Sequence, residues 1–596
     1  MSDMQLDDWV SRIADEVIAE AQRLGSPVVC ASGLSPSGPI HLGNLREVMT
    51  PHLVADEVRR RGIAADHLIS WDDYDRFRRV PAGLDGVDES WAEHIGKPLT
   101  SVPPPHGSPH RSWAAHFRAQ CEESLNELGI DYRSISQTEQ YTSGAYTEQI
   151  LFAMEHRAQI DKVLDQYRTL DAAAAAGAKP GNGGTPGKGG KPAPKLSEDE
   201  AAAAAAAAEG SGAAAEDDGS ADGGYYPYKP YCTVCGRDTT TVTGYDDATT
   251  ELSYSCACGH SETVLLKDFR HGKLVWKVDW PMRWAYEKVI FEPSGVDHQS
   301  PGSSFEVGKD LAPLFGWQRP IGPMYAFVGI KGMAKMSSSR GRVPVPADAL
   351  QIMEPALVRW LYARRRPNQS FDIAFDAEIQ RLYDEWDALQ RRVSEGAAGP
   401  AEYAAQVRAS SVADRSLPVT PHPISYRTLA SIVDITTGDE DQLLRIVGQL
   451  DPKDPVSSVD ELRPRLDCVE HWVATRMAAE DRTVVRTGPA TELLAAATDE
   501  QRESLRMLLD GNGSELSAVE DGWTLEGLTH QVYGVPKVQR GFAADQIVKG
   551  DKELSAAQRT FFVLLYRLLI DKDTGPRLPT LLLAIGPERV RALLTP

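Results

Sequence analysis

The chain has 596 residues, a formal net charge of −22 at pH 7, 42% hydrophobic residues and 25% charged residues. This length predicts three or four domains, and the composition is that of an ordinary globular protein. The sequence lacks an apolar run of the ~18 residues that a membrane span needs, and its acidic, amphipathic beginning, MSDMQLDDWVSRIADEV, does not resemble a signal peptide. We therefore expect a cytoplasmic protein with no membrane association. The acidic average does not decide whether nucleic acid is bound, because basic clusters such as 364–366 interrupt it.

Residues 1–170 alternate between strand and helix signals. A short β-branched run at 27–32 (PVVCAS) predicts a strand, and 67–70 (HLIS) predicts the next one. Between them, apolar residues at helical spacing predict a helix over 44–61, which Pro51 is expected to kink. Strand, loop, helix and strand form a βαβ unit of a parallel sheet, whose ligands bind beyond the carboxyl ends of the strands. The loop PSGPIHLGN, residues 36–44, lies at that edge.

Residues 171–224 consist almost entirely of Ala, Gly, Pro, Ser and charged residues, with nine carboxylates against four lysines. Such a composition cannot bury enough apolar surface to offset its ordering entropy. We predict a disordered insertion that interrupts one domain, because strong structural signals resume at once with YYPYKPYC.

Four of the seven cysteines cluster between positions 232 and 258, within the next segment, residues 225–262. Cys232 and Cys235 form one close pair, and Cys256 and Cys258 form a second one after an apparent β-hairpin. Two such pairs can converge on one tetrahedral zinc ion, and an all-thiolate site is typical of a structural rather than a catalytic metal. Gly236 and Gly259 follow the pairs, where tight turns need a flexible residue, and His260 remains an alternative ligand.

The remainder divides into residues 263–345, which complete the α/β domain begun by 1–170, and a helical region, 346–596. In the latter, helices are predicted over 349–366, 379–395, 464–479, 491–510 and 556–570. The expected fold is therefore α/β, with a Rossmann-like parallel sheet that carries the zinc module and the insertion, followed by an all-α C-terminal region.

Two loops carry the chemistry of phosphate binding. His41 and Asn44 flank the start of a helix, whose free N–H groups would bind an anion, and Gly43 would let a nucleotide approach the backbone. Lys335, in the sequence KMSSS, would supply a mobile cation to phosphate groups, with Ser337, Ser338 and Ser339 as further donors. Each loop alone is weak evidence, whereas the two together are considerably stronger.

The sequence resembles the class I lysyl-tRNA synthetases. The loop PSGPIHLGN looks like the "HIGH" signature of class I aminoacyl-tRNA synthetases, and KMSSS looks like their "KMSKS" signature. The strings SGLSPSGPIHLGNLRE, DDYDRFRRVP, DWPMRWAYEKVIFEPSGVDH and KMSSSRG in this order point to the lysyl branch, over residues 10–370 outside the insertion and more loosely beyond.

The resemblance implies a two-step reaction with ATP, Mg²⁺, lysine and tRNA(Lys). Lysine is first activated to lysyl-adenylate with release of pyrophosphate, and then passes to the 3′-terminal ribose of the tRNA. The implied catalytic residues are His41, Asn44 and Lys335. The implied ATP-binding residues are Pro36, Ser37, Gly38, His41, Gly43, Asn44, Lys335, Met336, Ser337, Ser338 and Ser339. Asn44 stands in place of the second histidine of the "HIGH" signature. Ser338 stands in place of the second lysine of "KMSKS", which leaves Arg340 as a substitute cation.

The resemblance also implies that Gly33, Ser35, Trp276, His298 and Tyr325 bind lysine. The aromatic rings would pack against the lysine stem and face its ammonium group. At least one carboxylate must hold that ammonium away from water, and the candidates by position are Asp72, Asp73 and Asp279. For Asp72 and Asp73 the alternative is a turn that caps the strand. No editing domain is expected, since a wrong substrate would leave the buried carboxylate without a partner.

The helical C-terminal region would resemble an anticodon-binding domain, in which splayed bases stack on aromatic or arginine side chains. A monomer is favoured. The alternatives are a synthetase for glutamate or cysteine, which WPMRW and EPSGVDH argue against, and a zinc-containing tRNA-binding paralogue without activation chemistry, which would have no need of Lys335. A purely interaction-based role would rest on 171–224 alone.

Overall fold

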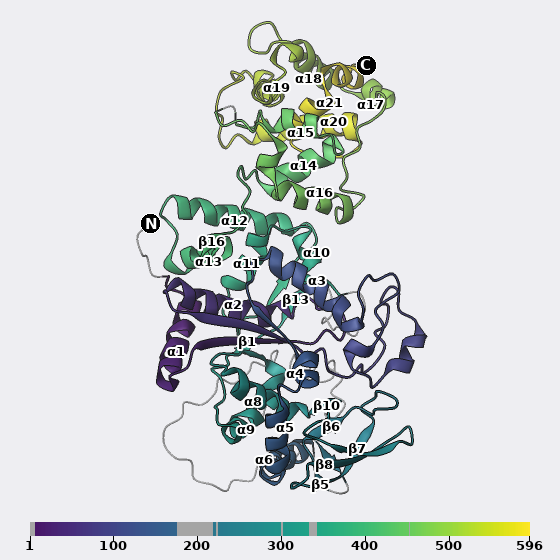
Figure 1. The fold of residues 1–596 in the computed structure, drawn as a ribbon. Helices are drawn as coiled ribbons and strands as arrows, with labels where there is room; N and C mark the ends of the chain where they lie inside the picture. Colours follow the sequence, from purple (N-terminus) through teal and green to yellow (C-terminus); the bar gives the residue numbers. More distant parts are fainter. Residues whose placement is uncertain are drawn as a thin grey trace. The chain divides into compact units, whose positions relative to one another are not determined.

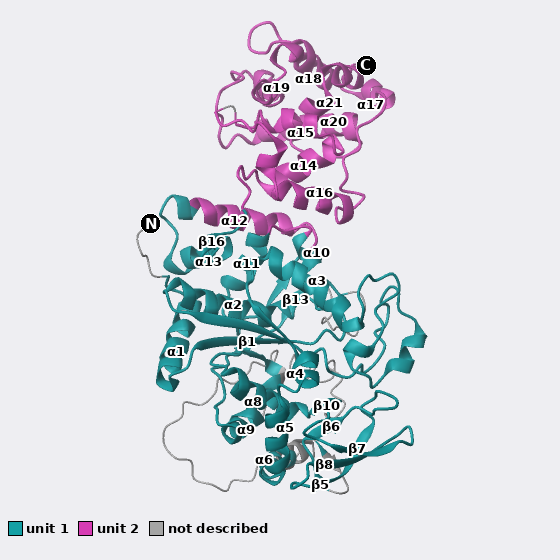
Figure 2. Cartoon of the chain, in the orientation of Figure 1, with its two compact units in different colours: residues 1–350, 355–374, 392–418 teal, residues 351–354, 375–391, 419–596 magenta. Residues whose placement is uncertain are grey.

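The computed structural model describes residues 6–175, 219–221, 224–299, 302–332, 343–451 and 453–595. The predicted KMSSS loop and most of the predicted insertion lie outside these residues. Two compact units divide the chain (Figure 2): the first comprises residues 1–350, 355–374 and 392–418, and the second comprises 351–354, 375–391 and 419–596. The domain boundaries expected from the sequence remain predictions.

A parallel sheet forms the centre of the first unit. β1 (Val28–Leu34) pairs with β2 (Ala65–Trp71), and β2 pairs with β3 (Arg133–Ser136), all in parallel. On the other side of β1, parallel bridges link Cys30 to Phe291 and Phe291 to Ile321. β11 (Ser294–Gly295) and β12 (Met324–Tyr325) pair in parallel a few residues further along the same two segments. The segments around 291 and 321 thus extend the sheet in the doubly wound order 3-2-1-4-5, and the predicted parallel sheet and βαβ unit are confirmed.

Helices cover both faces of this sheet (Figure 1). Val29, Ala31, Leu68 and Ile135 pack against α8 (Trp276–Glu287) and α9 (Ser304–Leu311). The opposite face is covered by α2 (Leu45–Arg60), which contains Pro51 within its span and contacts β1 and β2. Successive side chains of a strand point to opposite faces of the sheet, so the short apolar run of β1 packs against helices on both faces.

The other elements of the first unit lie before, within and after the crossovers of the sheet. They are α1 (Trp9–Leu24), α3 (Trp113–Glu127), α4 (Gln137–Ser143), α5 (Thr147–Glu155), α6 (Arg157–Ala175), β4 (Ser220–Ala221), β5 (Gly224–Tyr225), β6 (Tyr228–Pro230), β7 (Thr240–Tyr245), β8 (Glu251–Cys256), β9 (Ser261–Leu265), β10 (Gly272–Leu274), β13 (Val328–Ile330), α10 (Pro346–Leu350), α11 (Pro355–Ala363), β14 (Phe371–Ile373), α13 (Pro400–Ser410), β15 (Ser411–Val412) and β16 (Arg415–Ser416). Short 3₁₀ helices occur at Glu89–His94, Leu99–Ser101, Val296–His298 and Ala312–Phe315.

All regular elements among the described residues of the second unit are helices. Its helices are α12 (Ile379–Ser394, shared with the first unit at its end), α14 (Tyr426–Thr436), α15 (Glu440–Val447), α16 (Arg465–Thr475), α17 (Thr491–Ala496), α18 (Asp499–Asp510), α19 (Leu525–Val538), α20 (Lys552–Ile570), α21 (Leu578–Ile585) and α22 (Pro587–Leu594), with 3₁₀ helices at Val459–Leu462 and Val519–Gly522. Leu565, Leu568 and Leu569 of α20 are fully buried in its core. The predicted helical character of this region is confirmed, although β14, β15 and β16 lie in its first part, within the first unit.

Two predicted helices are wrong as single elements. The span 349–366 is broken between α10 and α11, because Pro355 disfavours helical geometry at Glu354 and opens the next helix instead. The span 491–510 is split into α17 and α18, since Thr498 and Gln501 form a capping box that starts a new helix.

The edges of the predicted insertion are ordered. α6 continues to Ala175, and β4 pairs with β5, so residues 171–175, 220–221 and 224 belong to regular elements. The prediction of disorder for 171–224 is therefore wrong at both ends and otherwise concerns residues that the structure does not describe. Among the described helices, none has the length and apolar character to cross a membrane.

A buried ion cluster joins the N-terminus of the first unit to α13. The guanidinium of Arg408 donates to Asp8 at 2.8 and 2.9 Å and to Glu57 at 2.8 Å, and these side chains are at most 3% exposed. Asp8 also caps α1 by accepting the N–H of Ser11. Three segments far apart in the sequence therefore share one set of charge-assisted hydrogen bonds.

We predict that Arg408→Ala lowers the free energy of unfolding of the first unit by about 3–5 kcal/mol, because Asp8 is left buried without its cation and Glu57 keeps only its contact with Arg61. Calorimetry should show the transition of this unit at a markedly lower temperature. The control is Arg415→Ala, whose partner Asp131 is 54% exposed and whose removal should cost less than about 1 kcal/mol. Equal shifts for the two variants would contradict the structural role of the cluster.

Candidate active site

A cavity of about 350 Å³ opens where the strand order reverses, between the carboxyl ends of β1 and of the neighbouring segment after Phe291. This is the place at which open α/β sheets bind ligands. The cavity is lined by most of the residues predicted for amino-acid binding, with one residue of the nucleotide loop: Gly33, Ser35, Asn44, Asp72, Trp276, His298 and Tyr325. Asp73 and Asp279 are not among its lining residues.

The HLGN loop between β1 and α2 is held by its own hydrogen bonds. Nδ1 of His41 accepts the N–H of Gly43 at 3.1 Å, and the side-chain oxygen of Asn44 accepts the N–H of His41 at 3.1 Å. Because Nδ1 of neutral His41 accepts a hydrogen bond, its ring hydrogen is on Nε2. Because the side-chain oxygen of Asn44 is already an acceptor, its amide nitrogen remains to donate to a ligand.

The expectation of free N–H groups at the start of α2 is wrong. Each backbone N–H from His41 to Glu47 donates to an oxygen or nitrogen of the protein, those of residues 44–47 to carbonyls three residues earlier. A tight turn runs directly into the helix here, so its N–H groups are used before a ligand arrives. An anion at this loop would have to be bound by side chains.

The chain that follows the KMSSS motif returns to this loop. The N–H of Leu42 donates to the carbonyl of Pro344 at 3.0 Å, and the hydroxyl of Tyr362 donates to the carbonyl of Leu42 at 2.9 Å. Residues 335–339 themselves lie outside the described part of the chain. The motif is nevertheless bounded by Lys331, next to β13, and by Pro344 at the HLGN loop.

Aromatic side chains from α8 line one side of the cavity. Trp276 stacks on Trp280 with ring centroids 5.0 Å apart, and the ring of His298 meets Trp280 edge-on at 5.5 Å. The guanidinium of Arg283 lies 5.6 Å from the Trp276 ring centroid. Helical spacing of 276, 280 and 284 explains why one face of α8 presents a row of indoles.

Asp279 and Asp72 already have cationic partners. Asp279 is fully buried and accepts from Arg283, from the hydroxyl of Tyr141 at 2.6 Å and from Lys273, whose Nζ lies 3.4 Å away. Asp72 pairs with Nη1 of the same Arg283 at 2.5 Å. A second ammonium would have to compete with these contacts.

Asp73 has a structural role, as expected from the alternative interpretation in which it belongs to a turn that caps the strand. Its carboxylate accepts the hydroxyl of Ser136 at 2.6 Å and the N–H of Thr138 at 2.8 Å, at the start of α4. It thus ties the end of β2 to the end of β3.

Five carboxyl groups that the sequence reasoning did not single out also line the cavity: Asp75, Asp238, Glu287, Glu47 and Glu292. Of these, Glu47 and Glu292 accept hydrogen bonds from neutral groups. Glu47 accepts the N–H of Gly33 at 3.1 Å and the hydroxyl of Tyr325 at 2.9 Å. Glu292 accepts the indole N–H groups of Trp280 at 3.0 Å and Trp284 at 2.6 Å. Glu47 lies one helical turn after Asn44, so the predicted helix already placed it on the same face as the nucleotide loop.

Burial, opposed by the hydrogen bond from Tyr325 and assisted by the nearby Glu292 carboxyl, raises the pKa of Glu47 to about 8. Burial likewise raises the pKa of Glu292 to about 7, against the two indole donors. Both groups thus lie in surroundings that disfavour a negative charge unless a cation is present.

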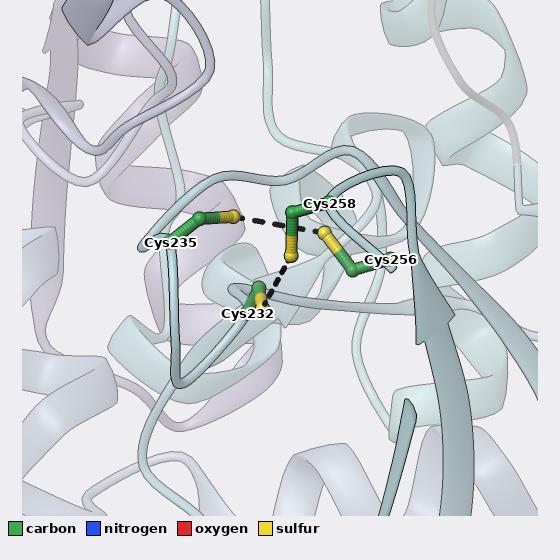
Figure 3. Close-up of side chains that lie close together, drawn as sticks. All are labelled: Cys232, Cys235, Cys256 and Cys258. Atoms are coloured by element: carbon green, nitrogen blue, oxygen red, sulfur yellow. Dashed lines mark hydrogen bonds between the residues drawn. The ribbon is translucent and has the colours of Figure 1, made fainter. Parts of the chain in front are cut away.

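The four clustered cysteines lie outside the cavity, and their sulfur atoms gather around one point (Figure 3). Sγ of Cys232 lies 3.8 Å from Sγ of Cys258, and Sγ of Cys235 lies 3.6 Å from Sγ of Cys256, with all four sulfurs within 4.8 Å of one another. Zinc–sulfur bonds of about 2.3 Å at tetrahedral angles separate sulfurs by about 3.8 Å, so the cluster fits such an ion.

The local fold explains this convergence. β7 and β8 form the predicted hairpin, with β9 as a third strand, and this hairpin brings the second pair of cysteines to the first. Gly236 and Gly259 adopt positive φ angles of 70° and 90°, as expected for the two tight turns. His260 is not part of the cluster and lies instead 3.3 Å from Glu262.

The doubly wound sheet, the HLGN loop at its switch point and the chain that returns to it after the KMSSS motif define a class I aminoacyl-tRNA synthetase. A family model described as tRNA synthetases class I (K) matches residues 7–414, and the chain belongs to this family, the class I lysyl-tRNA synthetases.

Curated relatives are similar over nearly the full length. A lysine–tRNA ligase of Streptomyces coelicolor is 64% identical over 592 residues, with 98% of each chain covered. Proteins of the same name from Treponema pallidum and Thermococcus kodakarensis are 31% and 32% identical, again with 98% of each chain covered.

Proposed function

We propose that this protein is an ATP-dependent lysine–tRNA ligase that forms lysyl-adenylate and then lysyl-tRNA(Lys). The observation that carries the proposal is the cavity at the switch point, which is lined by Asn44 of the nucleotide loop and by most of the residues expected to bind lysine. The full-length similarity to lysine–tRNA ligases supports it.

In the first step the lysine carboxylate attacks the α-phosphorus of ATP, and pyrophosphate leaves. The Nε2–H of His41 and the amide of Asn44 donate to phosphate or ribose oxygens, and Lys335, with the adjacent serines, stabilises the leaving pyrophosphate. No covalent enzyme intermediate is required, because this chemistry depends on positioning and on stabilisation of phosphate charge. In the second step the terminal ribose hydroxyl of the tRNA attacks the lysyl carbonyl and AMP leaves. Mg²⁺, expected to accompany ATP, neutralises phosphate charge.

Lysine is proposed to lie along the row of indoles, with Trp276, His298 and Tyr325 against its aliphatic stem. Gly33 and Ser35, at the end of β1, leave room for the backbone of the amino acid. Asp72, which faces the cavity while paired with Arg283, contributes charge to the same space.

The cysteine cluster is proposed to hold a structural zinc ion. Four thiolates leave no open coordination position, and the ion would cross-link the turn after Cys232 to the β7–β8 hairpin. The helical C-terminal region is proposed to bind the anticodon of tRNA(Lys), with cytoplasmic location and a monomeric state as further expectations.

ATP–pyrophosphate exchange with each amino acid, with and without tRNA, tests the proposed function. Exchange should require lysine. Exchange with another amino acid would contradict the substrate, and no exchange under any condition would favour a tRNA-binding paralogue.

We predict that Lys335→Ala slows lysine activation by at least about 100-fold, the size of effect expected when a preorganised donor to transition-state charge is removed. Single-turnover formation of lysyl-adenylate gives the rate, and calorimetry gives the dissociation constant for lysine, which should change less than threefold. An unchanged rate would refute the role of Lys335.

We also predict one zinc ion per chain, lost in the double variant Cys232→Ser and Cys235→Ser. Elemental analysis after dialysis provides the measurement, because the remaining two thiolates bind zinc too weakly to retain it. Cys121→Ala is the matched control, since this buried thiol on α3 lies outside the cluster. Purified protein without zinc would contradict the assignment.

A further inference from the structure

The carboxyl groups that line the cavity fall into two classes. Four of the six have a cationic partner: Asp72 with Arg283, Asp75 with Lys273, Asp238 with Arg76 and Glu287 with Arg133. Glu47 and Glu292 form no ion pair with any described residue and accept hydrogen bonds from neutral donors. A cationic ligand would therefore complete the charge balance of the cavity at these two positions.

Glu47 has the geometry of a binding residue. Its two oxygens are oriented by donors from different elements, the N–H of Gly33 on β1 and the hydroxyl of Tyr325 on β12, so the carboxyl is held without being neutralised. Glu292 is more enclosed, at 5% exposed, and each of its oxygens holds one indole of α8. It orders the row of tryptophans and adds negative charge behind Glu47.

A series of hydrogen bonds that begins at Arg46 on α2 holds the segment that carries Tyr325. Arg46, next to Glu47, donates to the carbonyls of Arg366, Pro367 and Gln369, and the carbonyl of Pro367 accepts the N–H of Ala326 at 2.9 Å. The guanidinium of Arg46 is therefore used to anchor this loop. It does not neutralise the neighbouring carboxyl.

We propose that Glu47 is the residue that binds the side-chain ammonium group of lysine, and that its carboxyl group loses a proton when lysine binds. The proposal rests on the proposed function. In the empty cavity the carboxyl is protonated; on binding, its O–H bond breaks, the proton passes to solvent, and the carboxylate pairs with the ammonium. A neutral side chain of similar length provides no such compensation, so the step contributes to amino-acid specificity.

Other titratable groups near Glu47 do not supply the missing cation. The titratable groups that act on it are Tyr325 on β12, Glu292 beside β1 and Asp72 after β2. The other cations that line the cavity act on other carboxyl groups: Lys273 and Arg78 on Asp75, and Arg76 and Lys229 on Asp238. Arg283 is committed to Asp72 and Asp279.

The sign of the pH dependence follows from the raised pKa of about 8 for Glu47 in the empty site. Below that pH, binding must release a proton, so the lysine association constant should rise up to tenfold per pH unit between about pH 6 and 8 and level off above. The lysine ammonium, with a pKa of about 10.4, remains charged across this range.

The test is isothermal calorimetry of lysine binding to the full chain at pH 7, in buffers of different ionisation enthalpy. Wild-type protein should release close to one proton. Glu47→Gln should release close to none and bind lysine at least about 30-fold more weakly at pH 8, because one member of a buried charge pair is removed. Glu306→Gln, at a surface ion pair on α9, is the control and should change binding less than twofold.

A folding defect is distinguished by two readouts. Glu47→Gln should bind ATP as wild type does and should unfold, without lysine, at the same or a higher temperature, since it removes a buried carboxyl that lacks a cation. Wild-type protein that binds lysine without releasing a proton, or Glu47→Gln with wild-type affinity, would overturn this proposal alone. Loss of affinity in Glu292→Gln but not in Glu47→Gln would overturn the choice of residue, and wild-type protein that does not bind lysine would overturn the proposed function as well.

Discussion

The backbone pairing of β1 with the segment around Phe291 is the contact on which the active site depends. Ala31 donates to the carbonyl of Phe291 at 2.8 Å, and Ile290 donates to the carbonyl of Val29 at 2.9 Å. These bonds join two halves of a sheet that are separated in the sequence by the cysteine module and the low-complexity segment. The cavity lies beside this pairing, so Gly33 on one segment and Glu292 on the other come to line one space.

Charge matching is the second constraint on the cavity. Arg283 is shared by Asp72 and Asp279, and Lys273 by Asp75 and Asp279, so each of these three carboxylates has a cationic partner within the protein. Glu47 has no cationic partner among the residues that the structure describes. Buried carboxyl groups without a cation cost stability, and such sites persist in proteins where the missing charge arrives with a ligand.

Much of the fold could be predicted because its signals are local. The apolar run at 27–32, the helical spacing after Asn44 and the paired cysteines each specify structure over a few residues. The strand, the helix and the convergence of the four cysteines are confirmed, and the zinc ion stays a prediction. The strand-like segments at 291 and 321 could not be predicted, because they form only short bridges and lack an alternating pattern. Pro355 indicates a break in the predicted helix over 349–366. The apolar spacing on either side of it nevertheless led to the prediction of one continuous helix.

The site was predictable in part for the same reason. Residues at strand ends, such as Ser35 and Asp72, can be located from a βαβ pattern, and the cavity brings them together. Whether a carboxylate is already paired depends on contacts between distant segments, as for Asp279 with Lys273 and Tyr141. The sequence alone therefore left Asp72, Asp73 and Asp279 as candidates, whereas the structure directs attention to Glu47, a residue within the first turn of α2.

A crystal structure of the protein with bound lysine would test this account most directly. It should place the side-chain nitrogen of lysine within about 3 Å of a Glu47 carboxylate oxygen, with the Arg283 pairs to Asp72 and Asp279 intact. A lysine ammonium bound instead to Asp72 or Asp279, with Arg283 displaced, would contradict it.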